Sequence, residues 1–140
     1  QSVVIFGKAK SLNKIIEKPI GVDLILSYKR ASNILENELK DKNFELSNTT
    51  DPNIFKTELE KNLFKKINEL RKYFQNINKD ENFEQSLENL AESKKIVFDF
   101  FDNVIVNDED QTIKKNRLEL IQMLCKTFDN YVNFSLIDSL

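Results

Sequence analysis

The scarcity of glycine and proline most constrains what this chain can fold into. Its 140 residues include two Gly and two Pro, which leaves few places for the tight turns of a β-sandwich or β-barrel. The apolar residues recur instead at the three- and four-residue spacing of amphipathic α-helices. A chain of this length is normally one domain, and its 40% hydrophobic residues can build a core without covalent staples. We therefore predict a single all-α domain over residues 1–140, a bundle of about six helices.

Prolines, acidic residues and polar stretches set the expected helix boundaries. Lys18-Pro19 ends the first helix, because the residue before a proline avoids the helical region. Asp51-Pro52 starts a helix, with a carboxylate as cap and proline in the first turn. The polar residues 41–50 are the expected loop, and the second helix carries Leu26 on its apolar stripe. The expected helices cover about residues 5–16, 21–40, 51–75, 83–91 and 94–103, and a last helix starts behind residues 108–110 and runs to about 132.

The residue inventory argues against most kinds of active site. The chain has no His, so it lacks the usual general base and metal ligand. Its single cysteine, Cys125, rules out an internal disulfide and a cysteine-based zinc cluster; its helical spacing from other apolar residues predicts a small buried hydrophobe. Neither a glycine-rich phosphate loop nor a closely spaced metal-binding set is present. We predict no catalytic residue, no metal site and no cofactor in this chain.

Targeting and membrane signals are also absent from the sequence. No stretch is apolar for the roughly 20 residues that a membrane span needs, and no signal peptide is visible. We expect a cytoplasmic, reducing setting and no membrane partner. Gln1 in place of Met suggests that the chain is cut from something longer.

The net charge of −2 is not typical of a protein that binds nucleic acid by charge alone. The negative charge is concentrated in residues 76–112, which hold three basic and ten acidic side chains, so the remainder is mildly basic. Any RNA contact is therefore expected to use a local patch. A solvated acidic face on a neutral protein is the simpler interpretation of the charge.

The most distinctive segment joins two of the expected helices. Paired phenylalanines end one helix, an apolar arm with two asparagines follows (residues 102–107), and an acidic cap opens the next helix, which contains Asn116-Arg117-Leu118. This arrangement places amide side chains and a cation at a helix–helix junction.

On these residues the chain resembles the C-terminal anticodon-binding, DALR-like domain of the bacterial glycyl-tRNA synthetase beta subunit. That family has a Lys-Arg-x-x-Asn-Ile-Leu segment, matched by residues 29–35. Its diagnostic stretch reads Phe-Phe-Asp-x-Val-x-Val, then an acidic loop, then Asn-Arg-Leu, matched by residues 100–106, 109–110 and 116–118. The resemblance covers essentially the whole chain.

The resemblance implies a tRNA-binding module of an aminoacyl-tRNA synthetase. The whole enzyme would join glycine to its tRNA with ATP, as a hetero-oligomer whose alpha subunit carries the adenylate-forming site. This domain would grip the anticodon arm and contribute no bond-making residue. Glycine codons fix two anticodon letters as cytosine. The side chains that recognise these bases must therefore accept a hydrogen bond from the cytosine amino group and donate hydrogen bonds to its ring nitrogen and carbonyl.

Asn103 and Asn107 are the first candidates for base contacts. Sequence-specific RNA recognition works on unstacked loop bases, and an amide side chain both donates and accepts hydrogen bonds. The structural alternative is strong, because Asn commonly caps a helix C-terminus or shapes a turn.

The cations of the last helix are candidates for phosphate contacts. Lys114 and Lys115 are expected in its first exposed turns. Arg117 lies on the apolar stripe, so its stem is expected to pack inward. Its guanidinium would then clamp a phosphate or, as we favour, tie the carbonyls of the turn and Asp102 together.

Lys29, Arg30 and Asn33 form a second candidate RNA-binding cluster, with a solvated helix face as the alternative. Phe98, Phe100 and Phe101 are suited to base stacking, but core packing is the expectation for the last two, while one of the three is expected near the surface. The acidic residues 108–110 are expected to cap a helix rather than to bind a cation.

Two rival functions stay open at this point. One is a helical protein-interaction module without RNA contact, which the net charge favours. The other is the anticodon-binding domain of an arginyl-tRNA synthetase, although the Phe-Phe-Asp and Asn-Arg-Leu segments favour glycine specificity.

Overall fold

A computed structural model of the protein describes residues 5–6, 19–40, 45–47, 49–76 and 83–133. These residues form four long helices. This confirms the all-α prediction. The elements, in chain order, are β1 (Ile5–Phe6), α1 (Pro19–Leu39), the 3-10 helix η2 (Pro52–Ile54), α2 (Glu58–Asn76), α3 (Phe83–Asn103), α4 (Gln111–Tyr131) and β2 (Val132–Asn133).

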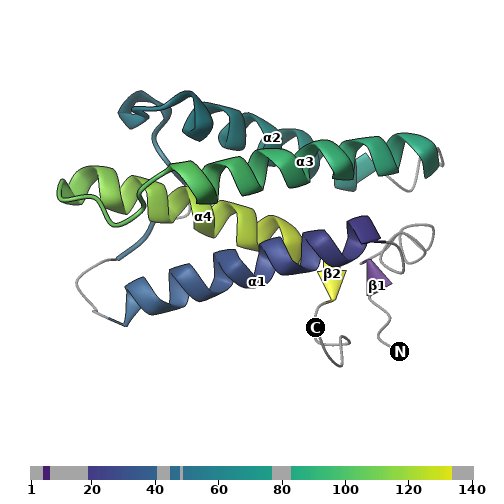
Figure 1. Cartoon of the computed structure of the whole chain (residues 1–140), viewed down its shortest axis with the longest axis horizontal. Coiled ribbons are helices and arrows are strands. Elements are labelled where there is room, and N and C mark those ends of the chain that lie inside the picture. Colours follow the sequence, from purple (N-terminus) through teal and green to yellow (C-terminus); the bar gives the residue numbers. More distant parts are fainter. Residues whose placement is uncertain (1–4, 7–18, 41–44, 48, 77–82, 134–140) are drawn as a thin grey trace.

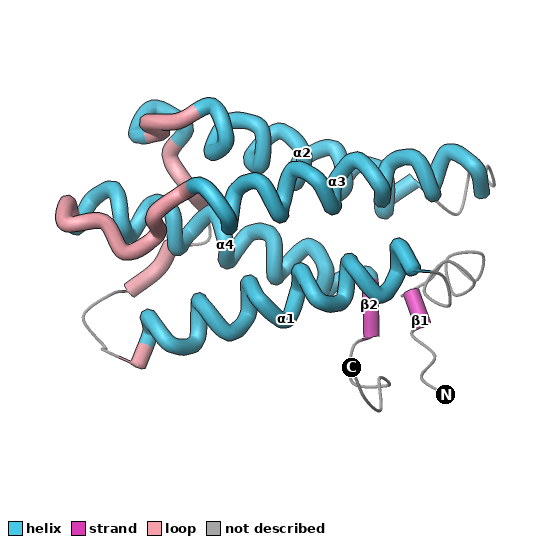
Figure 2. Tube along the Cα trace, viewed as in Figure 1, coloured by secondary structure: helices cyan, strands magenta, loops and turns pink. Residues whose placement is uncertain are grey.

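The four helices run alternately up and down the long axis of the bundle (Figure 1). Both α1 and α2 pack against α3 and α4, so each of the first two helices lies in a groove between the last two. At one end of the bundle β1 pairs antiparallel with β2, with Ile5 opposite Asn133 and Phe6 opposite Val132. The loops gather at the other end, where α1 and α3 finish and α2 and α4 begin (Figure 2).

Three of the predicted boundaries are wrong, two of them for a clear local reason. The predicted 51–75 helix is divided, because Phe55 adopts an extended backbone (φ −58°, ψ 133°) after the 3-10 turn. The predicted helices 83–91 and 94–103 are one helix, α3, since no Gly or Pro interrupts it and Ser93 is fully buried within it. Ile5 and Phe6 form a strand where a helix was expected. The rest of that predicted helix lies outside the described residues, as do residues 41–44 and 48 of the predicted loop.

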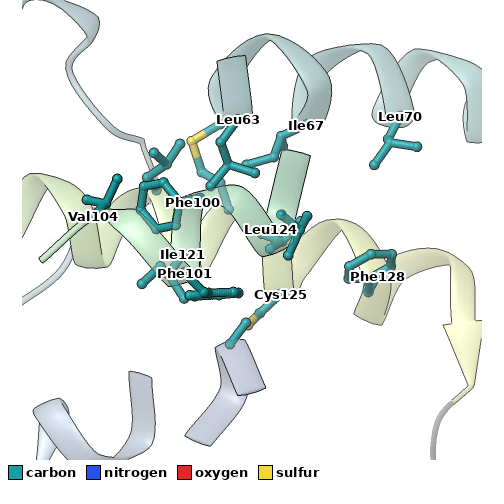
Figure 3. Close-up of a cluster of buried hydrophobic side chains, with 14 of the residues drawn as sticks. Leu63, Ile67, Leu70, Phe100, Phe101, Val104, Ile121, Leu124, Cys125 and Phe128 are labelled. Atoms are coloured by element: carbon teal, nitrogen blue, oxygen red, sulfur yellow. The ribbon is translucent and has the colours of Figure 1, made fainter. Parts of the chain in front are cut away.

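The core lies where α2, α3 and α4 meet, with α1 closing one side (Figure 3). Leu63, Ile67 and Leu70 recur at helical spacing along α2 and are at most 1% exposed. Phe100 and Phe101 are buried and meet edge to face, with ring centroids 5.6 Å apart. The prediction of core packing for these two rings is confirmed. The buried residues of α4 that complete the cluster are Leu120, Ile121, Met123, Leu124, Cys125 and Phe128.

One position of the predicted apolar stripe of α1 is wrong, although Ala31 is buried and Ile34 and Leu35 pack against the core as predicted. Leu26 is 44% exposed, whereas the neighbouring Ile25 is 2% exposed and joins the core. Both residues are equally apolar, so composition gives no preference between them. The direction in which α1 rests on α3 and α4 decides which of the two is buried.

Side-chain caps fix where the helices begin. Asp110 Oδ1 accepts hydrogen bonds from the backbone N–H groups of Thr112 (2.9 Å) and Ile113 (3.3 Å), which confirms that the acidic stretch caps α4. At the start of α2, Thr57 Oγ1 accepts from the Glu60 N–H (3.2 Å) and Glu60 Oε1 accepts from the Thr57 N–H (3.2 Å). This reciprocal pair is a capping box.

Cys125 is a buried residue of the core, as predicted. Burial, together with the nearby Asp129 carboxylate, raises the pKa of its thiol to about 12. Because the thiolate is the reactive form of cysteine, the fold holds this side chain in its unreactive form at neutral pH.

The Asp110 cap generates a stability prediction. Replacing Asp110 with alanine removes the acceptor for two free N–H groups of α4 and should lower the free energy of unfolding by about 1 kcal/mol in urea denaturation. Glu109→Ala is the matched control, because Glu109 is an exposed neighbouring carboxylate whose side chain caps nothing in the described part of the chain. Equal losses for the two variants would argue against the cap.

The raised pKa of Cys125 generates a second prediction. Above the normal thiol pKa of about 8.5, an unfolded chain forms thiolate whereas the folded one remains protonated. At pH 9 a thiol-specific reagent should therefore modify the folded protein far more slowly than the urea-unfolded chain. Similar rates in both states would show that the thiol is accessible and ionised in the fold.

Candidate nucleic-acid interface

The loop end of the bundle is organised by four buried polar residues in the first half of α4. Residues 114, 116, 117 and 119 are each 7% exposed or less, although all four are polar or charged. Residue 114 contacts the end of α1, and residue 117 contacts the start of α2 and the α3–α4 turn. Residues 116 and 119 contact the loop before η2. These contacts position the surface that the sequence marked as a candidate RNA-binding site.

Arg117 connects α4 with two other segments. Its Nη2 donates to Glu60 Oε1 of α2 at 3.0 Å, and its Nη1 donates to the Ile105 carbonyl of the α3–α4 turn at 2.6 Å. Nη1 also lies 3.5 Å from Asp108 Oδ2. The expectation that Arg117 packs inward and ties the carbonyls of the turn is confirmed. Its expected contact with Asp102 is wrong, because Asp102 pairs with Arg30 instead.

The Arg117–Glu60 pair is almost fully removed from water, with side-chain exposures of 7% and 1%. The Glu60 oxygen that binds Arg117 also accepts from the Thr57 hydroxyl at 3.0 Å. One carboxylate therefore caps α2 and fixes α4 at the same time. Because a buried charge that loses its partner is strongly unfavourable, these two functions depend on each other.

Asn116 and Glu119 hold the loop that precedes α2. The Asn116 amide accepts from the Asp51 N–H (2.7 Å) and donates to the Asp51 carbonyl (3.0 Å), as a neighbouring strand would. The Thr50 hydroxyl lies 2.7 Å from Asn116 Oδ1 and 2.9 Å from the Asn116 carbonyl, and donates to this pair of acceptors. Glu119 Oε2 accepts from the Ser47 N–H (2.8 Å) and from the Ser47 hydroxyl. Sequence reasoning missed the Asn116 and Glu119 contacts, because both residues lie off the apolar stripe of α4 that contains Ile113, Arg117 and Ile121.

The two candidate asparagines lie on the exposed α3–α4 turn. Asn103 ends α3 and donates to the Asp99 carbonyl at 2.9 Å, which is a capping contact. Asn107 is exposed, and its side chain has no hydrogen-bond partner in the described part of the chain. Between them Ile105 is 70% exposed. The turn therefore presents one free amide, one capping amide and one apolar side chain to solvent.

The structure separates the two candidate lysines of α4. Lys114 is buried and pairs with Glu38 of α1 at 3.0 Å, so its expected exposure is wrong. The α1 helix packs over that face of α4 and covers it. Lys115 is exposed as expected and has no ion-pair partner among the described residues.

The candidate cluster on α1 is exposed and lies close to the end of α3. Arg30 Nη1 is 3.0 Å from Asp102 Oδ1, and its guanidinium carbon is 5.2 Å from the centre of the Phe101 ring. The neighbouring Lys29 and Asn33 are exposed on the same helix. Phe98 is half-buried, which fits the expectation that one aromatic lies near the surface; Lys94 lies 5.7 Å from its centroid. RNA contact by the candidate residues stays a prediction.

An open groove of about 600 Å³ lies beside the candidate turn. One wall belongs to the loop before α2 and consists of Ser47, Thr49, Thr50, Asp51 and Ile54, and the other belongs to α4 and consists of Gln111, Thr112, Lys115, Asn116 and Glu119. Within the described residues no group of three His, Cys, Asp or Glu side chains is placed to hold a metal ion, and none of the described helices is long and apolar enough to cross a membrane.

Comparison with known proteins agrees with the family resemblance that the sequence motifs indicate. The family model of the DALR anticodon binding domain matches residues 24–138. Relatives include the glycine–tRNA ligase beta subunits of Rickettsia prowazekii (strain Madrid E), 33% identical over 127 residues, and Rickettsia bellii (strain OSU 85-389), 36% identical over 128 residues. In each case 91% of this chain matches 18% of the relative, so the chain spans about a fifth of their length.

The Arg117–Glu60 contact generates a prediction. Arg117→Met keeps an unbranched side chain but leaves the Glu60 charge buried and unpaired, so the free energy of unfolding should fall by about 3–5 kcal/mol. Lys115→Met, two residues away on the exposed face, should change it by no more than about 0.5 kcal/mol. Urea denaturation measures both, and a small loss for Arg117→Met would show that the pair does not support the fold.

Proposed function

The chain belongs to the DALR anticodon-binding domain family, and from this premise we propose that it binds the anticodon arm of a glycine-accepting tRNA as part of a glycine–tRNA ligase beta subunit. The named relatives, at 33% and 36% identity over 91% of the chain, support the glycine assignment over the arginine alternative. The observation that carries the proposal is the exposed α3–α4 turn, held in one conformation by the buried Arg117.

The candidate residues divide into two groups in this proposal. Asn103, Asn107 and Lys115 contact the RNA directly, because their side chains are exposed at the loop end. The cluster of residues 29–33 on α1 extends that contact along the bundle. Lys114 and Arg117 support the surface through buried ion pairs and shape the turn that the RNA meets.

Hydrogen bonding to bases, rather than charge, carries the recognition in this proposal. Several cations near the loop end are neutralised within the fold, among them Arg30, Lys114 and Arg117. The protein has a net charge of −2. Binding by this chain alone is therefore weak and depends only modestly on salt, since each phosphate contact adds about 0.7 to 0.9 to the salt slope.

In the proposed assembly, the reactions of the amino acid take place on another subunit. We place adenylate formation with ATP on the alpha subunit of a hetero-oligomer, in the cytoplasm, and assign no bond-making residue and no cofactor to this chain. Its contribution is to hold the anticodon arm of the tRNA.

A protein-interaction module without RNA contact is the second candidate, and the exposed turn also supplies the observation that favours it. Ile105 is 70% exposed and lies in a turn flanked by exposed carboxylates at 102, 109 and 110. Such a surface suits a basic protein partner as well as it suits an RNA base.

An NMR titration distinguishes the two candidates. The chain is titrated with a glycine tRNA anticodon stem-loop and, in parallel, with the same loop in which both cytosines are changed. Anticodon binding predicts shifts in residues 103–117 and 29–33 that disappear with the altered loop. The absence of shifts with either RNA at low salt would contradict the proposal. A salt dependence of binding whose slope implies six or more ion contacts would also contradict it.

A variant of the turn tests the same proposal at one side chain. Asn107→Ala removes an amide that has no partner in the described structure, so stability should be unchanged while the dissociation constant for the stem-loop rises about fivefold, the value of one hydrogen bond. Asn62→Ala, an exposed amide on α2, is the matched control. Wild-type affinity in Asn107→Ala would remove Asn107 from the binding site.

A further inference from the structure

The groove beside the α3–α4 turn holds hydrogen-bond donors and acceptors in a rigid frame. Its α4 wall carries the exposed residues Gln111, Thr112 and Lys115. Two carboxylates also line it, Asp51 on the loop wall and Glu119 on the α4 wall, each with one oxygen engaged within the fold. Among the described residues no contact engages their second oxygens, so both carboxylates retain capacity to accept.

The two walls of the groove are joined to each other before any ligand arrives. Asn116 holds the backbone of Asp51 through both its N–H and its carbonyl, and Glu119 holds Ser47. Both anchoring side chains are at least 94% buried. A site whose walls are already ordered pays little conformational entropy when it binds, which favours affinity and specificity.

The size and chemistry of the groove match one nucleotide with a particular base. Its volume of about 600 Å³ lies within the range of about 300–1,000 Å³ that is typical of small-molecule pockets. The free edge of cytosine has one amino donor beside two acceptors, the ring nitrogen and the carbonyl. A carboxylate accepts from a cytosine amino group, while the Gln111 amide and the Thr112 hydroxyl can donate to the acceptors.

We propose that this groove receives a single unstacked cytosine of the anticodon loop. The base edge faces the Asp51 carboxylate and the Gln111 amide, and the adjoining phosphate lies on the Lys115 ammonium. This inference rests on the proposed function and adds the position and the identity of one base.

Binding measurements on the 140-residue chain test the groove. The RNAs are the glycine anticodon stem-loop and two versions in which one cytosine is replaced by uridine, which reverses the donor and acceptor at two positions of the base edge. Gln111→Ala should weaken binding of the parent loop about tenfold and leave binding of one uridine loop unchanged, so that discrimination at that position is lost. Asp51→Asn keeps a good helix cap and should reduce the same discrimination.

Lysine variants separate a local phosphate contact from general charge. Lys115→Ala should weaken binding of all three RNAs by about three- to tenfold and lower the salt slope by about 0.7. Lys126→Ala is the matched control, because Lys126 is exposed on the same helix, three turns away and on nearly the same face. This variant should bind the three RNAs with affinities within twofold of those of the wild type.

The outcomes distinguish the groove from the proposed function. If the wild-type chain binds and discriminates cytosine while the variants at residues 51, 111 and 115 bind like it, the groove is excluded and anticodon binding stands. If the wild-type chain binds none of the RNAs, both proposals fail together. Loss of discrimination at one position in Gln111→Ala and Asp51→Asn, with Lys126→Ala unchanged, supports the groove.

Discussion

The buried contact between Arg117 and Glu60 is the interaction on which the loop end of the bundle depends. A guanidinium and a carboxylate in a core are tolerated only when each satisfies the other. Here the carboxylate also caps α2 by accepting from the Thr57 N–H, and the guanidinium also donates to the Ile105 carbonyl. The start of α2, the start of α4 and the α3–α4 turn are therefore fixed relative to one another by one pair of side chains.

The two halves of α4 carry different tasks. From residue 120 onward its buried face is mainly apolar and forms the centre of the core. From 114 to 119 its buried face is largely polar and anchors loops and helix ends by ion pairs and hydrogen bonds. Apolar packing is weakly directional, so it supplies stability, whereas hydrogen bonds demand defined geometry and set the shape of the exposed surface. A single helix thereby links the stability of the bundle to the form of its candidate RNA-binding end.

The distribution of charge explains how a slightly acidic domain suits a role in tRNA recognition. Sequence shows the cations of α4 as a cluster, but the fold buries Lys114 and Arg117 against carboxylates and leaves Lys115 in solvent. Few positive charges remain to attract phosphate. Exposed amides, hydroxyls and carboxylates at the loop end are then the groups available to distinguish one base from another, which is consistent with the proposed role in anticodon recognition.

The sequence by itself determined the all-α class, the family, the caps at Asp51 and Asp110, and the burial of Phe100, Phe101 and Cys125. These follow from local spacing, from cap chemistry and from motif residues that are contiguous along the chain. Tertiary structure alone decided that Ile25 rather than Leu26 is buried, that Arg117 pairs with Glu60 rather than Asp102, and that Lys114 lies beneath α1 while Lys115 borders a groove. These outcomes depend on which helix covers which face, and partners separated by 57 to 76 residues are chosen by packing rather than by local sequence.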